Sequence, residues 1–528
     1  MRILLTILLL LAGVVGSAAA DDAVQELERL GGRVERNDEG EIVAADLSGA
    51  AGVNAGLDLA AGLTRLQRLT LPARVDDAGL ALLKPLKELQ ELDLRPQYTL
   101  TATGLAQLRS LSGLKALRLP PQTQDGGLEF LRVLPRLERL DLSRCSQLTN
   151  AGLRELAGLA ALRSLSLAEV RGLTDLGWRE LAKLTTLESL DLSRTSINDD
   201  GLPLLRPLSK LHSLNLAGTK IRGEGLVYLA EMNSLQSLDL EQTKLRPDTV
   251  PVLAKLMSLR SLVLPAGMTT AAVSPLQSVS RLEVLSVCDS ELDDVGLACV
   301  ASLRELRKLQ LNGARISDAG LAHLSHLTEL EDLNLTGTGV TDAGLVHLKP
   351  LVKLVRLSLN GSSITLSGVV RLFVRDQRRS LSEALRALGV AVFDEQGRIV
   401  SIDVAGTDFG DEEMQHVAPL TTLKELHLAA TKVTDAGMIH VKPLIHLERL
   451  YVAKCNITDA GLAHVAGLPR LRAINLYGTK MTTAGLEHLA GLEELRLLSV
   501  TDVKLKPAMV DQLKQKLPRL TVSDYTPE

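Results

Sequence analysis

The chain has 528 residues, of which 45% are hydrophobic and only 2% are aromatic. A single core of this size would normally contain more large aromatic anchors, so the composition argues against one globular domain and favours a repeat array that buries leucine. The formal net charge of −4, from 59 basic and 63 acidic residues, gives no support to a nucleic-acid groove or an anionic-membrane surface.

Residues 1–20 have the pattern of a secretory signal peptide. Arg2 supplies a positive start, an apolar stretch runs to Val15, and three alanines ending at Ala20 form a small-residue cleavage site. Cleavage near Ala20 would leave a mature chain that begins at Asp21 and is periplasmic or secreted. An uncleaved anchor is the weaker alternative, because the apolar run is shorter than the roughly 20 residues of a bilayer span. We expect no membrane span in the mature chain.

A capped repeat array is predicted over residues 21–366. A short helix at Ala23–Leu30 precedes a hairpin that turns at Asn37–Gly40, and together they would cover the apolar edge of the first coil. The pattern Leu-x-x-Leu-x-Leu then recurs every 23 to 25 residues. Its copies begin at Leu66, Leu89, Leu114, Leu137, Leu162, Leu187, Leu211, Leu235, Leu259, Leu282, Leu306, Leu330 and Leu354.

One of these repeats shows how each coil is expected to fold. Leu333 and Leu335 alternate with Asn334, so the leucines point inward from a short strand and Asn334 faces solvent. Thr338 then turns inward, where its hydroxyl can bond backbone groups of the turn. Val340–Leu348 continues with a threonine cap, an acidic first turn and apolar residues at helical spacing. Each coil is therefore predicted to be one strand and one short helix.

The stack of coils must curve, because neighbouring strands lie about 4.8 Å apart whereas packed helices need roughly 8 to 10 Å. The fold class that follows is an α/β solenoid. We predict a right-handed superhelix with parallel strands on the concave face and short helices on the convex face.

The motifs Ser-Asp-Ala-Gly-Leu at Ser317–Leu321 and Thr-Asp-Ala-Gly-Leu at Thr458–Leu462 resemble the short bacterial relatives of the ribonuclease-inhibitor and cysteine-containing leucine-rich repeats. The resemblance covers nearly the whole mature chain and implies a leucine-rich-repeat solenoid that binds other proteins. It extends to the repeat half of F-box ubiquitin-ligase receptors and of bacterial effectors that imitate them. An F-box-like effector or substrate-recognition module is therefore the alternative function, although the leader sequence favours an exported protein.

After Leu359 the period stops, and the opening pattern of the chain then occurs a second time. Residues 367–388 are predicted to form a helical joint. The joint contains a set of arginines, which we interpret as a solvated helix face rather than an anionic docking site because acidic residues are interspersed. These arginines are Arg371, Arg375, Arg378, Arg379 and Arg386. A second capped array, residues 389–528, begins with a hairpin at Asp394–Gly397 and has repeats at Leu423, Leu447, Leu471 and Leu495.

Four cysteines, Cys145, Cys288, Cys299 and Cys455, follow the leader. Cys145 and Cys455 occupy the position that Thr338 has in its own repeat. We therefore predict single buried thiols that fill space and donate weakly, and no disulfide framework.

No motif for catalysis or metal binding stands out, and we expect no catalytic residue, metal or cofactor. One helix position is occupied in successive repeats by His323, His347, His416, His440, His464 and His488. Neighbouring copies would lie roughly 10 Å apart, which is too far for two imidazoles to share a zinc ion, so we interpret them as packing residues. Carboxylate pairs such as Asp76 with Asp77 and Asp293 with Asp294 lie at predicted helix starts, where capping explains them more simply than acid–base catalysis.

The outward column of the concave face is the predicted binding site. In the first array its acidic members are Asp93, Asp141, Asp191 and Asp239, and in the second array it contains His427, Tyr451 and Asn475, with Tyr477 beside it. Tyrosine is enriched at binding hot spots, because it supplies rigid contact area and one polar tip. The alternative is that these positions are polar only because they face solvent, which applies more strongly to the aspartates than to the tyrosines.

The sequence thus predicts a non-enzymatic recognition scaffold that binds a protein partner through its concave surface, with self-association as a further option. Nucleic acid is not an expected partner. An enzyme with an unrecognised site would instead require a deep pocket in which titratable groups converge.

Overall fold

The computed structural model describes residues 17–359, 362–364, 391–396, 398–523 and 526–527. The chain divides into two compact units, Met1–Cys288 and Asp289–Glu528, which are described separately. The expected signal peptide lies outside the described residues up to residue 16, and the predicted joint at residues 367–388 also lies outside them. Within the described part, no helix is both long and apolar enough to cross a membrane.

Short strands, one from each coil, form two main sheets in which the strand order follows the chain. The 15-stranded sheet contains β1 (Arg33–Arg36), β2 (Ile42–Asp46), β3 (Arg68–Thr70), β4 (Glu91–Asp93), β5 (Ala116–Arg118), β6 (Arg139–Asp141), β7 (Ser164–Ser166), β8 (Ser189–Asp191), β9 (Ser213–Asn215), β10 (Ser237–Asp239), β11 (Ser261–Val263), β12 (Val284–Ser286), β13 (Lys308–Gln310), β14 (Asp332–Asn334) and β15 (Arg356–Ser358). The seven-stranded sheet contains β16 (Ala391–Phe393), β17 (Ile399–Asp403), β18 (Glu425–His427), β19 (Arg449–Tyr451), β20 (Ala473–Asn475), β21 (Leu497–Ser499) and β23 (Thr521–Val522). Strands β22 (Lys504–Leu505) and β24 (Thr526–Pro527) form a separate parallel pair.

A hairpin starts each main sheet, and parallel pairs follow it. Strand β1 is antiparallel to β2 and β16 is antiparallel to β17, whereas the pairs from β2 onward and from β17 onward are parallel, for example β8 with β9 and β19 with β20. The first hairpin closes where Asn37 N donates to Glu41 O at 2.9 Å and Gly40 adopts a φ of 80°. The corresponding bond of the second hairpin joins Asp394 N to Arg398 O at 2.9 Å.

The helical segments of the coils are short, and many are 3-10 helices, written η. The first unit contains α2 (Ser17–Arg29), α3 (Leu57–Ala61), α4 (Asp77–Leu82), α5 (Ala102–Leu105), η1 (Ala106–Ser110), η2 (Asp125–Val133), α6 (Asn150–Arg154), η3 (Glu155–Gly158), α7 (Asp175–Leu181), η4 (Asp199–Leu205), α8 (Leu226–Leu229), η5 (Pro247–Lys255), α9 (Thr270–Val273) and η6 (Ser274–Ser278). The second contains α10 (Asp294–Val300), α11 (Asp318–Leu324), η7 (Gly344–Leu348), α14 (Asp411–Val417), α15 (Asp435–Met438), η8 (Ile439–Val441), α16 (Asp459–Leu462), η9 (Thr483–Leu489) and α17 (Pro507–Lys516). Pro203 and Pro251 lie inside η4 and η5, where the missing N–H prevents a regular α-helical ladder.

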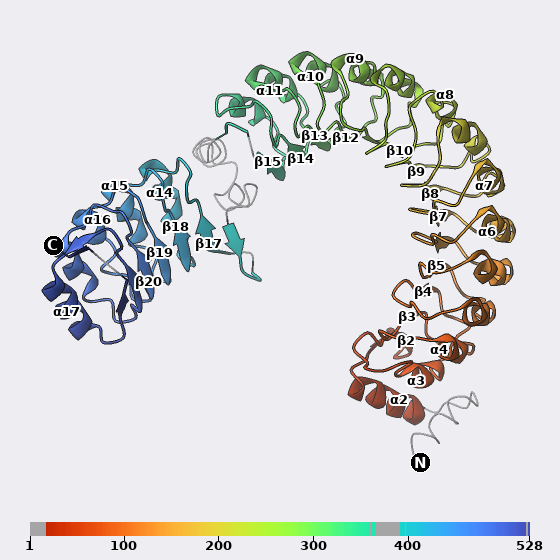
Figure 1. Ribbon diagram of the computed structural model, residues 1–528, viewed down its shortest axis with the longest axis horizontal. Coiled ribbons are helices and arrows are strands. Elements are labelled where there is room, and N and C mark those ends of the chain that lie inside the picture. The colour runs from red at the N-terminus through yellow and green to blue at the C-terminus, as the bar shows by residue number, and fades with distance from the viewer. Residues whose placement is uncertain (1–16, 360–361, 365–390, 397, 524–525, 528) are drawn as a thin grey trace. The chain divides into compact units, whose positions relative to one another are not determined.

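The predicted α/β solenoid is confirmed. In the first unit, β2 to β10 line the inner side of the curve and α4 to α8 lie on its outer side (Figure 1). In the second unit, β17 to β20 form one face and α14 to α16 cover the other (Figure 1). The leucines of the repeat pattern, such as Leu333 and Leu335, are fully buried between strand and helix.

Inside the coils, a ladder of threonines satisfies carbonyl groups of the turns. Thr338 is buried and its Oγ1 donates to Leu335 O at 2.7 Å, as predicted. The same bond is made by Thr195, Thr219, Thr243, Thr431 and Thr479. Cys145 and Cys455 take this position as buried thiols, and Cys455 Sγ donates to Leu428 O at 2.9 Å. Among the described residues, no disulfide is formed by any of the four cysteines.

Carboxylate pairs at the helix starts connect one coil to the next. Asp76 caps its own helix α4 by accepting from Gly79 N at 3.0 Å, which confirms the capping interpretation. Asp77 instead accepts from Thr101 N at 2.9 Å and from Thr101 Oγ1 at 2.5 Å, so it binds the residue that caps helix α5 in the next repeat. The repeats are therefore joined by side chains on the helix side as well as by the sheet.

Candidate binding surface

The residues predicted to bind in the second array lie on neighbouring strands of one sheet. Across β18, β19 and β20, His427 is in register with Tyr451, and Tyr451 with Asn475. Tyr477 follows β20 by two residues. Because parallel neighbours are about 4.8 Å apart, the structure places these side chains together on the exposed sheet face. We call His427, Tyr451, Lys454, Asn475 and Tyr477 the tyrosine patch.

Two rings of the tyrosine patch stack on each other. The ring centroids of His427 and Tyr451 are 4.2 Å apart, and the ring planes differ by 23°. On the same strand, His427 Nε2 lies 3.6 Å from Glu425 Oε2, while the other oxygen of Glu425 is 3.0 Å from Arg449 Nη1. The side chain of His427 remains 30% exposed. The stack is thus held from one side and accessible from the other.

The remaining members of the patch are connected through the turn after β20. Asn475 Oδ1 accepts from Tyr477 N at 3.0 Å, which fixes the start of this turn. Lys454 N donates to Tyr477 O at 2.7 Å, and Lys454 Nζ lies 5.5 Å from the centroid of the Tyr477 ring. A cation at that distance from an aromatic face is attracted by the ring quadrupole. The ammonium group of Lys454 is therefore positioned beside the ring of Tyr477.

Small side chains surround the rings. Ala429 and Ala453 precede the turns of the two adjacent repeats, and Ala473 is in register with Arg449 on one side and with Leu497 on the other. Leu497 is 47% exposed and adds an apolar edge. The strands and turns next to the rings therefore carry mostly small side chains.

The acidic column of the first unit has a structural role in every copy. Asp93, Asp141, Asp191 and Asp239 lie on β4, β6, β8 and β10, with one strand between each successive pair. In each aspartate, Oδ1 accepts from the backbone N–H two residues later, at 2.8 to 3.0 Å. This bond fixes the turn at the end of the strand, and Asn215 makes it equally well. The turn therefore provides a structural reason for aspartate at these positions.

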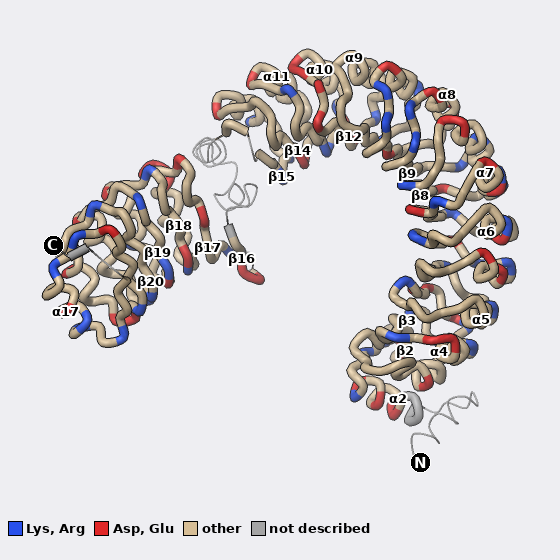
Figure 2. The backbone as a smooth tube through the Cα atoms, in the orientation of Figure 1, with Lys and Arg blue, Asp and Glu red and all other residues tan. Residues whose placement is uncertain are grey.

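The charges of this column differ from strand to strand. Burial would raise the pKa of Asp93, but hydrogen bonds from Arg95, together with the charges of Arg95 and Arg118, outweigh it and hold the pKa below its ordinary value. Burial raises the pKa of Asp239 against the hydrogen bond from Glu241 N, and the charge of Asp191 raises it further. Basic and acidic residues are otherwise interspersed along the chain (Figure 2), and many pair across repeats, as Arg307 does with Glu331 at 2.9 Å.

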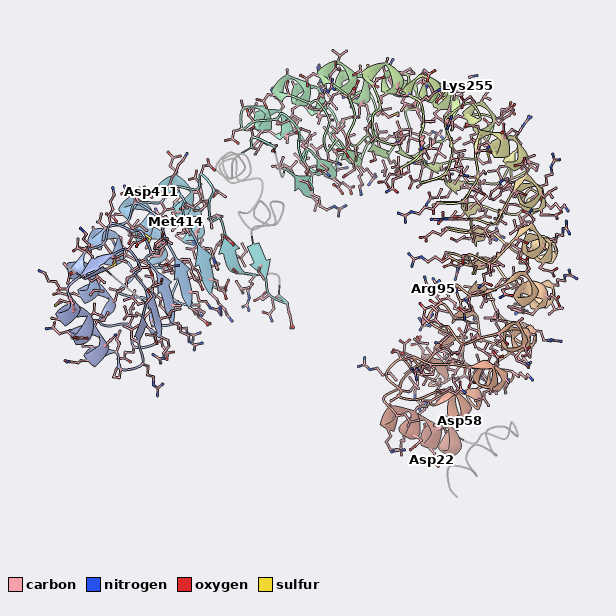
Figure 3. The ribbon with its side chains drawn as sticks, in the orientation of Figure 1. Asp22, Asp58, Arg95, Lys255, Asp411 and Met414 are labelled. Atoms are coloured by element: carbon pink, nitrogen blue, oxygen red, sulfur yellow. The ribbon has the colours of Figure 1, made fainter. Side chains whose placement is uncertain are left out.

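The sequence-based prediction named Asp141 and Asp191 but missed Tyr98, and all three line an open hollow on the strand side of the first unit. It measures about 710 Å³, and its lining includes Tyr98, Arg95, Arg144 and Asp191. Tyr98 is 74% exposed. Figure 3 shows that Arg95 projects from the strand side of the first unit, which is opposite the helix side where Lys255 lies. The repeat that begins at Leu89 is 25 residues long, and its tyrosine in the turn is the feature of the sequence that could have revealed this hollow.

The histidines of the repeated helix position do not form a metal site. Among the residues that the structure describes, no three His, Cys, Asp or Glu side chains are grouped closely enough to hold a metal ion. His464 is partly buried on the coil of α16, where burial lowers its pKa, the charge of Lys442 lowers it further, and Asp435 opposes both.

The leucine-rich repeats predicted from the sequence are confirmed by comparison with protein families. Residues 126–384 match the family described as a leucine-rich repeat region, and residues 444–466 match the family described as a leucine rich repeat. A comparison with curated proteins gives no match. Among solved structures, an internalin of Listeria monocytogenes is 19% identical, with a TM-score of 0.38 over 71% of this chain and 88% of that one. A leucine-rich-repeat protein of Leptospira interrogans is 18% identical, with a TM-score of 0.39 over 79% of this chain and 92% of that one.

Proposed function

We propose that this leucine-rich-repeat solenoid is a non-enzymatic recognition scaffold that binds a protein partner through the concave sheet face of its second array. The observation that carries the proposal is the half-buried stack of His427 on Tyr451, with Tyr477 beside it. Only 2% of the chain is aromatic, so two tyrosines and a stacked histidine on one small surface are a strong concentration of contact area. A few residues supply most of the binding energy at protein interfaces, and tyrosine is enriched among them.

The patch is already ordered before a partner binds. Stacking fixes His427 and Tyr451, and the hydrogen bond from Tyr477 N to Asn475 fixes the turn that bears the second tyrosine. A partner therefore has to immobilise few rotatable side chains, which lowers the entropic cost of association. The open sheet face suits a polypeptide surface better than a small molecule, which usually binds in an enclosed pocket.

We also infer that the chain is exported and meets its partner in the periplasm or outside the cell. The support for this is the leader pattern of residues 1–20, with its small-residue site at Ala20. N-terminal sequencing of the protein from its source cells should begin at Asp21. A chain that retains Met1 in those cells would contradict export by cleavage.

We assign the repeats to the short relatives of the ribonuclease-inhibitor and cysteine-containing class. Support comes from the Thr-Asp-Ala-Gly-Leu motif, whose aspartate binds the next repeat, and from cysteine in the inward threonine position at Cys455.

The binding proposal is tested by affinity capture from the exported fraction of the source cells, with residues 21–528 as bait. The matched bait carries Tyr451→Ala and Tyr477→Ala, and a control bait carries Tyr228→Ala on helix α8. A protein retained by the wild type and the control but lost by the double variant supports the proposal, and a second copy of this chain would count as such a partner. Equal retention by all three baits would place the binding site elsewhere.

A further inference from the structure

The groups that the tyrosine patch presents to solvent are mainly hydrogen-bond donors. Asn475 uses Oδ1 to accept from Tyr477 N, which leaves the two N–H groups of Nδ2 for a ligand. The ammonium of Lys454 offers three more donors beside the Tyr477 ring. Within the described residues, no carboxylate lies in ion-pair distance of Lys454 Nζ, and no hydrogen bond is formed by Asn475 Nδ2.

The arginines next to the patch differ from Lys454, because their charges are already neutralised. Arg449 lies 3.0 Å from Glu425, and Arg472 lies 3.4 Å from Glu448 and 3.4 Å from Glu494. Lys454 thus differs from these two arginines in having no carboxylate partner among the residues that the structure describes.

We propose that the partner segment recognised by the tyrosine patch is acidic, with an Asp or Glu carboxylate that pairs with Lys454 and accepts from Asn475 while the chain around it packs on Tyr451 and Tyr477. This inference rests on the proposed function, because it specifies what the patch binds. A carboxylate accepts several hydrogen bonds at once, which matches the donors available here.

Other segments fit the patch less well. A basic segment would bring a second positive charge next to Lys454, and Glu425 is already shared between Arg449 and His427. The carboxylate of Asp403 is in register with His427 on β17, two strands away from β19. A purely apolar segment would cover the ammonium of Lys454 and the amide of Asn475 without giving either an acceptor, and burying such groups unpaired is costly. An acidic segment avoids both penalties.

The test is selection of a random-peptide display library on the full chain and, in parallel, on the Tyr451→Ala, Tyr477→Ala variant. Peptides that need the two tyrosines should be enriched in Asp or Glu, and replacing that acid by its amide should weaken binding about tenfold. Lys454→Gln should cause a similar loss, and Lys454→Glu should shift selection toward Lys or Arg. Lys514→Gln, an exposed lysine on helix α17, should change nothing.

The outcomes separate this inference from the proposal on which it rests. Tyrosine-dependent peptides that lack an acid and bind Lys454→Gln as well as the wild type would overturn the acidic partner and leave the binding surface intact. Identical selection on the wild type and the tyrosine variant would overturn the surface itself. Thermal unfolding of each variant, measured by circular dichroism, ensures that only folded proteins are compared.

Discussion

Asp435 holds the residue that starts the next helix, because its Oδ2 accepts from Thr458 Oγ1 at 2.6 Å and its Oδ1 from Thr458 N at 2.8 Å. Thr458 in turn caps helix α16 by accepting from Ala460 N at 3.3 Å. Equivalent contacts join Asp318 to Thr341, Asp411 to Thr434 and Asp459 to Thr482, and Figure 3 labels Asp411 at the start of α14. The carboxylate and hydroxyl together form a clamp between successive repeats.

Removing one clamp should loosen the array locally. Asp435→Ala deletes two charge-assisted hydrogen bonds and leaves Thr458 N without its acceptor, so we expect a loss of about 2 kcal/mol. Because a repeat array need not unfold in one step, hydrogen exchange of the amides in α15 and α16 is the better measurement. Asp511→Ala on α17, an exposed position, is the matched control and should be neutral. Equal hydrogen-exchange protection of these amides in both variants would mean that the clamp does not stabilise this part of the array.

Gly461→Ala tests the clamp from the other side. Alanine in a helix is normally more stable than glycine by roughly 1 kcal/mol. Here a methyl group at Gly461 would overlap Asp435 Oδ1 and also press on the side chain of Ile457, so we expect destabilisation instead. Gly491→Ala, where no atom lies within 4 Å of the added carbon, should be neutral or stabilising. The comparison is made by urea denaturation, and a stabilised Gly461→Ala variant would contradict the expected collision.

The repeat architecture could be predicted from the sequence because each coil obeys the same local rules. Leucine spacing identified the inward positions of β14, and the inward threonine at Thr338 was expected to bond the turn, as it does. The cross-repeat role of Asp77 was not predicted, because a helix start provides a sufficient local reason for a carboxylate. The 3-10 geometry of η4 and η5 was not predicted, although Pro203 and Pro251 lie inside these helices and remove an N–H that a regular α-helix requires.

Asp239→Asn should make the first unit more stable at neutral pH. Burial raises the pKa of Asp239 above its ordinary value, so the ionised form is less favourable in the folded chain than in the unfolded chain. Protonated Asp239 therefore stabilises the folded chain at pH values below the ordinary carboxyl pKa. This stabilisation is lost as the pH rises through the pKa that Asp239 has in the folded chain. Asparagine keeps the acceptor for Glu241 N and stays neutral.

The measurement for this variant is the unfolding midpoint at neutral and at acid pH. We expect a modest increase at pH ~7 that disappears below the ordinary carboxyl pKa of about 4. A variant that is less stable at neutral pH would show that the charge of Asp239 is compensated after all.

The thiol of Cys145 should be unreactive toward alkylating reagents in the folded chain. Burial raises the pKa of its thiol to about 12, and the charge of Asp141 adds to this effect against a hydrogen bond from Thr123. At pH ~9 only about one thiol in a thousand would be ionised, and the thiolate is the reactive form. Iodoacetamide labelling followed by mass spectrometry should leave Cys145 unmodified until denaturant is added. Fast labelling in the native protein would contradict this burial.

The candidate site was only partly accessible to sequence reasoning. The repeat register places His427, Tyr451 and Asn475 in one column, and the structure has them on adjacent strands. The repeat pattern does not specify the rotamers that stack the rings of His427 and Tyr451. It also does not specify that Lys454 adopts a φ of 60° in its turn and lies beside Tyr477. Tyr98 was overlooked because its turn departs from the regular length.

The most direct test of the central claim is calorimetric titration of a purified partner with the wild-type chain and with the Tyr451→Ala, Tyr477→Ala variant. If the tyrosine patch is the centre of the interface, truncating two hot-spot rings should raise the dissociation constant by about a hundredfold or more. Tyr228→Ala on the helix side should bind like the wild type. An unchanged affinity of the folded double variant would contradict recognition through this surface.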